Sequence, residues 1–401
     1  MTPFNPASFR RQFPALAQYG VYLDSAATAL KPQPVIDAVQ AFYHAGGTVH
    51  RSQHHGAQAL TARFEQARAR VARWLRAPRR EDIVWTRGAT EAINLVAQSY
   101  ARPRLAPGDE IIVSEAEHHA NLIPWLMVAE QTGARVVKLP LGADRLPDID
   151  RLAGLFTPCT RLLALGQMSN VTGGMPDLPR AIDLAHRYGA VVVVDGAQGA
   201  VHAPVDVQAL DIDFYVFSGH KLYGPTGIGV LYGKTALLEQ MPPWQGGGKM
   251  MTQVSFDGFT PQAVPQRFEA GTPHIAGVIG LAAAIDWLAD QDLTAAERYS
   301  GQLACQAEER LARFAGFHSL RSPGSCLLSF GFAGVHHSDL VTLLAENDIA
   351  LRSGHHCAQP LMRALGLGGA LRASFAPYNN QQDVDRLVEG VGQALALLTD
   401  E

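Results

Sequence analysis

Between about residues 80 and 235 the chain alternates short runs of apolar, β-branched residues with stretches of helical periodicity. Seven runs have the length of a core strand, at 82–86, 110–114, 135–139, 161–165, 190–195, 213–218 and 229–232. Apolar and polar positions alternate little within these runs, which predicts strands that are buried on both faces. Such strands, separated by helices, predict the α/β class with a mostly parallel sheet.

The rest of the chain follows a different pattern. Residues 236–275 are rich in Pro and Gly and show weak periodicity, so we expect a loop region there. Beyond it the pattern predicts two helices, two short strands and a closing helix, at 278–288, 294–314, 326–332, 371–375 and 381–398. That order of elements is typical of a smaller α+β domain.

Composition narrows the function classes. The 401 residues include 33 Lys+Arg and 37 Asp+Glu, a net charge of −4, which argues against nucleic-acid binding. The N-terminus lacks the apolar stretch of a signal peptide, and no apolar run approaches the roughly 20 residues of a membrane helix. The four cysteines form no CxxC pair, so neither a disulfide framework nor a zinc finger is indicated. We expect a cytoplasmic enzyme without a membrane partner.

The most informative stretch is 213–229, where a strand is followed at once by Ser218, His220 and Lys221. Functional residues of parallel sheets gather beyond the carboxyl ends of the strands. A lysine there is partly desolvated, which lowers its pKa and suits the free amine to a Schiff base with an aldehyde. Ser218 and His220 offer donors for a phosphate. The alternative for Lys221 is a solvated surface lysine.

Two further sequence blocks offer contacts for the remaining parts of a cofactor. Asp195 ends the most apolar strand, and a carboxylate there is either a helix cap or the partner of a pyridinium nitrogen. Thr90 lies where a strand passes through a Gly turn into a helix start, which favours phosphate binding but also suits a simple N-cap. Together the blocks indicate pyridoxal 5′-phosphate (PLP), since its aldehyde, ring nitrogen and phosphate are each provided for.

The chain then resembles the fold-type I PLP enzymes of the class V aminotransferase superfamily, within them the group II cysteine desulfurases and cysteine sulfinate desulfinases. The resemblance runs nearly end to end, through LDSAATALKP, VHRSQHH, TRGATEAINLVA, AEHHANLIPW, QMSNVTGG, VDGAQGA, SGHKLYGPTGIGVLYG, EAGTP, RSGHHCAQP and LRASFAPYN. It implies a homodimer with a large PLP-binding domain over 22–280, built on a mostly parallel seven-stranded sheet. A small α+β domain would comprise 1–21 and 281–401.

The resemblance also implies roles at matching positions. Lys221 would form the Schiff base and move the substrate Cα proton, Asp195 would pair with the pyridinium nitrogen, and His118 would stack on the ring. The other cofactor contacts implied are Ala89, Thr90, Gln198, Ser218, His220 and, from the neighbouring subunit, Thr272. The substrate contacts implied are Ala26, Asn170, Arg352 and Arg372, the last clamping the carboxylate. His119 receives no role and is expected to be structural.

Cys357 decides the kind of chemistry. It lies among Arg352, His355 and His356, surroundings that favour thiolate. His355, His356 and Cys357 could also be metal ligands, but three adjacent residues converge poorly on one tetrahedral ion, and we expect no metal. In the family this cysteine attacks the substrate sulfur and carries it as a persulfide. The alternative is a buried, inert cysteine, which is our expectation for the remaining three: Cys159, Cys305 and Cys326.

The expected reaction is therefore L-cysteine to L-alanine, with sulfur passed to Cys357 and then to an acceptor protein for iron–sulfur cluster or related biosynthesis. L-Cysteine sulfinate and L-selenocysteine are further expected substrates, and QMSNVTGG is closest to the sulfinate desulfinase branch. Their leaving groups depart more readily, so these reactions should depend less on Cys357. The alternatives are another PLP reaction on the same scaffold, such as transamination or β-elimination, and a non-catalytic sulfur-transfer adaptor.

Overall fold

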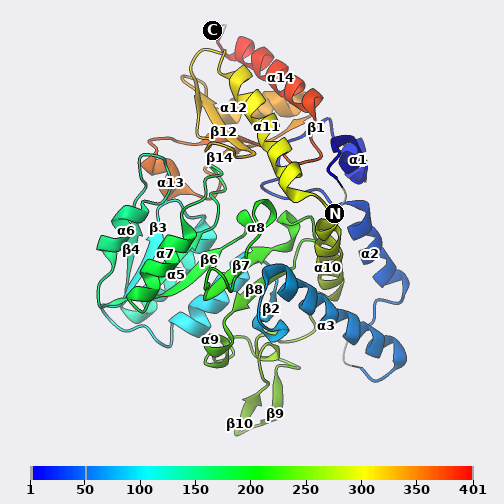
Figure 1. The fold of residues 1–401 in the computed structure, drawn as a ribbon, viewed down its shortest axis with the longest axis vertical. Coiled ribbons are helices and arrows are strands. Elements are labelled where there is room, and N and C mark those ends of the chain that lie inside the picture. Colours follow the sequence, from blue (N-terminus) through cyan, green and yellow to red (C-terminus); the bar gives the residue numbers. More distant parts are fainter. Residues whose placement is uncertain (1–2, 50–51, 400–401) are drawn as a thin grey trace.

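The computed structural model describes residues 3–49 and 52–399, and His50 and Arg51 of the VHRSQHH motif lie outside this part. Figure 1 shows a large sheet with its helices and, above it, a second sheet covered by the helices nearest the C-terminus. Among the described residues no helix is both long and apolar enough to cross a membrane.

The large sheet confirms all seven predicted strands. They are β2 (Ile83–Thr86), β3 (Glu110–Ser114), β4 (Arg135–Leu139), β5 (Thr160–Gly166), β6 (Val191–Asp195), β7 (Phe214–Ser218) and β8 (Gly229–Gly233). Their order is β2-β8-β7-β6-β5-β3-β4. Only β8 runs antiparallel to its neighbours, so the sheet is mostly parallel, as predicted.

Helices bury both faces of this sheet, which explains the lack of alternation in its strands. Val192 and Val194 of β6 face one hydrophobic cluster, whereas Val193 faces the other. The first cluster includes α2 (Gln33–His44), α3 (His55–Leu75), α7 (Leu178–Arg187) and α10 (Ile275–Ala289). The second includes α4 (Ala89–Leu95) and α5 (Ile123–Thr132). A strand between two apolar layers needs apolar side chains at every position.

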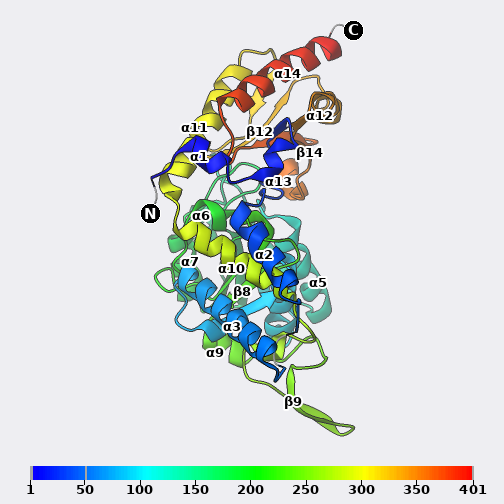
Figure 2. The same cartoon turned by 90° about the vertical axis from the view of Figure 1, so that its right-hand side faces the viewer.

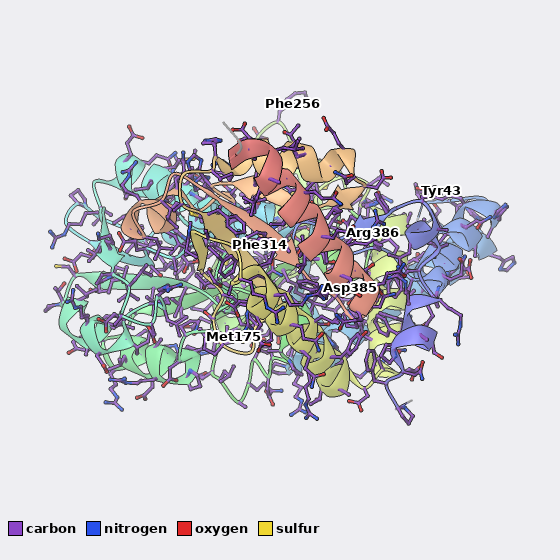
Figure 3. The ribbon with its side chains drawn as sticks, turned by 90° about the horizontal axis from the view of Figure 1, so that it is seen from above. Tyr43, Met175, Phe256, Phe314, Asp385 and Arg386 are labelled. Carbon is purple, nitrogen blue, oxygen red and sulfur yellow. The ribbon has the colours of Figure 1, made fainter. Side chains whose placement is uncertain are left out.

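The expectation of a loop over 236–275 is wrong in part. A short helix, α9 (Thr235–Glu239), opens the segment, and β9 (Met251–Ser255) pairs with β10 (Gly258–Pro261) in an antiparallel hairpin. Figure 2 shows the hairpin projecting from the end of the molecule opposite the second sheet. Its residues are largely exposed, including Phe256, which is labelled at the periphery in Figure 3. Without a buried face the hairpin lacks the apolar pattern on which the prediction depended.

The second sheet has the order β11-β12-β15-β14 and is antiparallel throughout. Its strands are β11 (Phe317–Ser319), β12 (Leu327–Phe332), β14 (Arg352–Gly354) and β15 (Ala370–Ser374). The helices of this region are α11 (Leu293–Leu311), α12 (His337–Glu346), α13 (Gln359–Ala364) and α14 (Gln381–Thr399). The sequence pattern predicted β12, β15, α11 and α14 and missed the shorter elements.

The N-terminal segment reaches this second region. Strand β1 (Val21–Tyr22) pairs in parallel with β13 (Ile349–Ala350), whereas α1 (Pro6–Arg10) places Phe9 in the cluster of the large sheet. The predicted division into 22–280 against 1–21 with 281–401 stays a prediction. Its second boundary falls inside α10, which packs on α2 and α3.

Candidate active site

A cavity of about 490 Å³ lies at the carboxyl ends of β5, β6 and β7, where the second sheet also contributes residues. Every predicted site residue except Thr272 lines it: Ala26, Ala89, Thr90, His118, Asn170, Asp195, Gln198, Ser218, His220, Lys221, Arg352, Cys357 and Arg372. Thr272 lines a different cavity of about 580 Å³, together with Trp85 and Trp244. One chain therefore brings together all the residues that were expected from a single subunit.

Asp195 and Lys221 carry opposite charges in this cavity. Asp195 ends β6 between β5 and β7, and its carboxylate accepts a hydrogen bond of 2.9 Å from the Ala197 N–H. Burial raises the pKa of Asp195, and the Lys221 ammonium opposes that rise. Burial lowers the pKa of Lys221 to about 8, and repulsion from Arg372 adds to the effect. A free amine is therefore accessible near neutral pH, as a Schiff base requires.

His118 is held as a neutral ring. Its Nδ1 accepts a hydrogen bond of 3.0 Å from the Ala120 N–H. Burial lowers the pKa of His118 to about 4, and the charge of Lys221 lowers it further. The remaining ring proton is consequently on Nε2, and an uncharged imidazole suits contact with the face of an aromatic ring.

Gln198 has a polar atom that lacks a partner. Its Nε2 lies 3.1 Å from His202 Nε2, while its Oε1 is buried and makes no hydrogen bond. Buried amide atoms are almost always hydrogen-bonded. An unpaired one at the cavity wall indicates that a ligand completes the site. His202 is held in turn by Glu297, whose carboxylate lies 2.9 Å from Nδ1.

At the other end of the cavity, the loop before α4 packs closely against β8. A Cβ on Gly229 would come within 2.4 Å of the Gly88 Cα, so glycine is required for this approach. The Ala89 N–H at the start of α4 donates to Ser218 Oγ at 2.9 Å. These hydroxyl and N–H groups, with Thr90 and His220, form a cluster of donors suited to a phosphate.

Arg372 is a buried cation whose guanidinium is only partly hydrogen-bonded. Its Nη1 donates to the Asn170 carbonyl at 2.8 Å and its Nη2 lies 3.7 Å from Asp24, but Nε has no partner. Burial lowers the pKa of Arg372 to about 10, against the attraction of Asp24. Arg352 is more exposed, and its Nη2 contacts the same Asp24 at 2.9 Å. Because it lines the cavity with a donor still free, Arg372 is suited to bind a substrate carboxylate.

Cys357 is exposed on the loop between β14 and α13. His356 and Cys357 have φ angles of 53° and 54°, the left-handed region that residues other than glycine rarely adopt. His356 is buried, donates from Nε2 to the Ala370 carbonyl at 2.9 Å, and accepts from Asn170 Nδ2 through its own carbonyl at 2.7 Å. The thiol thus lies at the edge of the cavity on a well-anchored backbone.

The expectation for the other three cysteines is wrong for two of them. Cys326 is buried, but Cys159 is exposed and Cys305 is half-buried. Cys159 lies in a surface turn and Cys305 on the amphipathic helix α11, where a small side chain is tolerated at the surface. Neither lines the cavity, so the distinction between Cys357 and these residues rests on position rather than exposure.

Sequence reasoning missed two buried or half-buried carboxylates. Glu117 accepts from Asn121 Nδ2 at 2.7 Å and from the Gly166 N–H at 2.8 Å, and burial raises its pKa to about 8. Asp24 bridges Arg352 and Arg372. Both lie inside quoted motifs, AEHHANLIPW and LDSAATALKP, but nothing local showed which side chains they would meet.

Among the described residues, His202, Glu297 and Cys326 are the one trio whose metal-type ligand atoms lie within 4.8 Å of one another. The hydrogen bond between His202 and Glu297 already accounts for this arrangement. Although burial lowers it, the charges of Cys326 and Glu297 raise the pKa of His202 above its ordinary value. His202 Nδ1 also lies 3.6 Å from Cys326 Sγ, so the trio is better described as a hydrogen-bonded cluster.

Residues 21–387 match the family described as Aminotransferase class-V. The chain is 68% identical to cysteine desulfurase CsdA of Escherichia coli K12, over all of both chains. A crystal structure of E. coli CsdA (S-sulfonic acid) superposes with a TM-score of 0.94, covering 99% of this chain and 100% of that one. A cysteine desulfurase from Thermococcus onnurineus gives 0.92 at 35% identity, covering 98% and 99% of the two chains.

A more distant structure is C-DES, described as a cystine C–S lyase. Its complex with cysteine persulfide is 25% identical, with a TM-score of 0.80 over 95% of this chain and 99% of that one. A second C-DES structure contains glycine covalently linked to its PLP cofactor.

Proposed function

The chain belongs to the class-V aminotransferase family, and from its cavity we propose that it is a PLP-dependent cysteine desulfurase. It converts L-cysteine to L-alanine and transfers the sulfur to Cys357 as a persulfide. One observation carries this proposal: a buried lysine with a lowered pKa and an exposed cysteine line the same cavity, from the large sheet and the second region respectively.

The residues of the cavity fit PLP. Gln198 Oε1 lacks a partner, and the donor cluster at the start of α4 suits the phosphate. Asp195 would pair with the ring nitrogen and His118 would lie on the ring face. PLP, when bound, supplies an aldehyde for the amine of Lys221 or substrate and a protonated ring that stabilises negative charge at the substrate Cα.

The protein's own groups would then act in sequence. Arg372 binds the substrate carboxylate through its free donor, with Asn170 beside it. Lys221, released as a free amine, removes the Cα proton, because its lowered pKa makes it a base near neutral pH. Asp195 would lie next to the ring nitrogen, where a carboxylate would favour the protonated form of that nitrogen.

Sulfur transfer uses the edge of the cavity. The Cys357 thiolate attacks the substrate sulfur, and a sulfur–sulfur bond forms as the Cβ–S bond breaks. The electron pair of the broken bond stays with the substrate, which is protonated to alanine. Because Cys357 is exposed, its persulfide can be reached by a sulfur-acceptor protein.

Two features support a homodimer. Thr272 lies outside the cavity that it was expected to complete, as a residue donated to a neighbouring subunit would. The β9–β10 hairpin exposes Val254, Phe256 and Phe259, an apolar surface that is costly to leave in water. The same proposal includes activity on L-cysteine sulfinate and L-selenocysteine. It also includes an acceptor protein for iron–sulfur cluster or related biosynthesis and a cytoplasmic location.

The decisive experiment incubates the holoenzyme with L-cysteine and identifies both products. We expect alanine, together with a Cys357 peptide heavier by one sulfur atom in the mass spectrum. Pyruvate without protein-bound persulfide would instead show β-elimination and would contradict the proposal. A purified protein that neither contains nor binds PLP would contradict it in favour of a non-catalytic adaptor.

A further inference from the structure

His119, which received no role from the sequence, makes two contacts with the loop that carries Cys357. Its N–H donates to the Cys357 carbonyl at 2.7 Å. Its ring Nε2 accepts from the Gln359 N–H at 3.2 Å, across 240 residues of sequence. A ring nitrogen that accepts must be unprotonated, so the proton of the neutral ring is on Nδ1. One half-buried residue therefore contacts the backbone of the loop on both sides of Ala358.

The ring contact replaces a helix cap that the loop lacks. Helix α13 begins at Gln359, and its N-cap residue, Ala358, has no side chain that could accept a hydrogen bond. The first N–H groups of a helix have no partner within the helix and need an external acceptor. His119 Nε2 supplies one from a different segment of the chain. The contact thus stabilises the start of α13, two residues beyond Cys357.

The loop needs such support because of its backbone. His356 and Cys357 are consecutive residues in the left-handed region, and neither is glycine. Conformations of this kind persist only where the surrounding structure holds them. His356 is anchored from its own side by Asn170 and Ala370. His119 provides the anchors on the other side.

We propose that His119 is a positioning residue for sulfur transfer, which holds the Cys357 loop at the cavity edge through its backbone N–H and its ring Nε2. This inference rests on the proposed function of Cys357. His119 does not line the cavity, so it acts through the loop rather than on the substrate. Burial, together with the nearby His355, lowers the pKa of His119, and this keeps Nε2 available as an acceptor.

The test compares three variants as holoenzymes with the wild type. His119→Ala removes the ring acceptor, and His119→Gln keeps an acceptor oxygen. His336→Ala is the matched control, because His336 Nδ1 also accepts a backbone N–H, that of Ser338 at 3.3 Å, away from the cavity. Hydrogen–deuterium exchange of the peptide containing Gln359 reports on the bond without any turnover. We expect about tenfold faster exchange in His119→Ala only.

Activity supplies the second readout. His119→Ala is expected to slow persulfide formation on Cys357 from L-cysteine by about tenfold or more, and to change alanine release from L-cysteine sulfinate by less than threefold. His119→Gln should restore at least half of the loss. An equal fall on both substrates would overturn the inference, since it would show a role in cofactor binding or folding. Unchanged exchange, or no rescue by glutamine, would overturn it as well.

The two proposals fail in different ways. If the wild type forms no persulfide, the proposed function is wrong, and the exchange experiment still decides whether His119 holds the loop. If His119→Ala does not fold, the wild type alone remains informative. Its Gln359 N–H must then be protected from exchange, and an unprotected amide would contradict the inference.

Discussion

The floor and the rim of the cavity are built differently. The floor, comprising His118, Asp195 and Lys221, follows strands of the large sheet, and burial changes the pKa of each member. The rim, residues 355–359, comprises the Cys357 loop and the first residue of α13. Cys357 is exposed there, and a few long-range hydrogen bonds hold the backbone. Proton transfer requires groups with tuned pKa values in a dry site. A persulfide that another protein must reach requires an exposed site. The proton-transfer groups and the exposed cysteine therefore occupy different parts of the cavity.

The largest expected effect comes from the floor. Lys221→Ala removes the amine that we propose to bind the cofactor and to move the Cα proton. Alanine formation should fall by about a thousandfold or more with both L-cysteine and L-cysteine sulfinate, because both need that proton transfer. Lys138→Ala, an exposed lysine outside the cavity, is the control and should leave both rates unchanged. A variant that lost only the cysteine reaction would contradict the assignment of Lys221 to a step that both substrates need.

Replacement at the rim should be selective. Cys357→Ala removes the proposed sulfur acceptor, so turnover of L-cysteine should fall by about a hundredfold or more, with no persulfide detected. Turnover of L-cysteine sulfinate should stay within about threefold, since its leaving group departs without a thiolate. Assays of alanine from each substrate measure the difference. Cys159→Ala, at an exposed cysteine away from the cavity, should change neither. Equal loss on both substrates would show that Cys357 acts in a step that both reactions share, as the floor residues do.

Arg372 and Arg352 sharpen the comparison because both contact Asp24 but differ in burial. Arg372→Lys should raise KM for both substrates by about 10- to 100-fold, the usual cost of a lost charge-assisted hydrogen bond. Arg352→Lys should have an effect of only a few-fold, because this side chain is half exposed and screened by solvent. Steady-state kinetics of the two variants decides the order. The reverse order would assign the substrate carboxylate to Arg352 on strand β14.

The last expected effect needs no substitution and concerns the pH dependence of Lys221 in the floor. The pKa of Lys221 is lowered to about 8, so below that pH its amine is protonated and has no lone pair. Uptake of PLP by the apoprotein should therefore quicken about tenfold per pH unit up to pH 8 and level off above it. His118, with its pKa at about 4, stays neutral over this range and adds no second step. Absorbance during reconstitution measures the rate, and a rate independent of pH between 6 and 8 would contradict the prediction.

The large sheet was predictable because the sequence of each strand shows that the strand is buried. A strand covered on both faces must be apolar throughout, as in Val191–Asp195, and such runs stand out in the sequence. The β9–β10 hairpin and helix α13 were missed for the opposite reason. The first has no buried face, and the second is too short to show a helical period. Elements with weak local patterns owe their form to what surrounds them.

The residues of the site divide in the same way, into those that a local sequence pattern identifies and those that it does not. Lys221, Asp195 and Ser218 were found because each stands at or just beyond the end of a strongly patterned strand. Asp24 was not, because its partners Arg352 and Arg372 lie more than three hundred residues away in the chain. Similarly, nothing near His119 in the sequence indicates Gln359.

The sequence by itself determined the α/β class, the positions of the strands and the residues that follow them, since burial of a strand or a helix face leaves a periodic record in the chain. The motifs also indicated the cofactor and the cysteine. Only the tertiary structure decided which side chains from distant segments meet, which charge is buried beside which, and how the Cys357 loop is held. These contacts depend on how the two sheets and their loops pack together, and that packing leaves no local pattern to identify in advance.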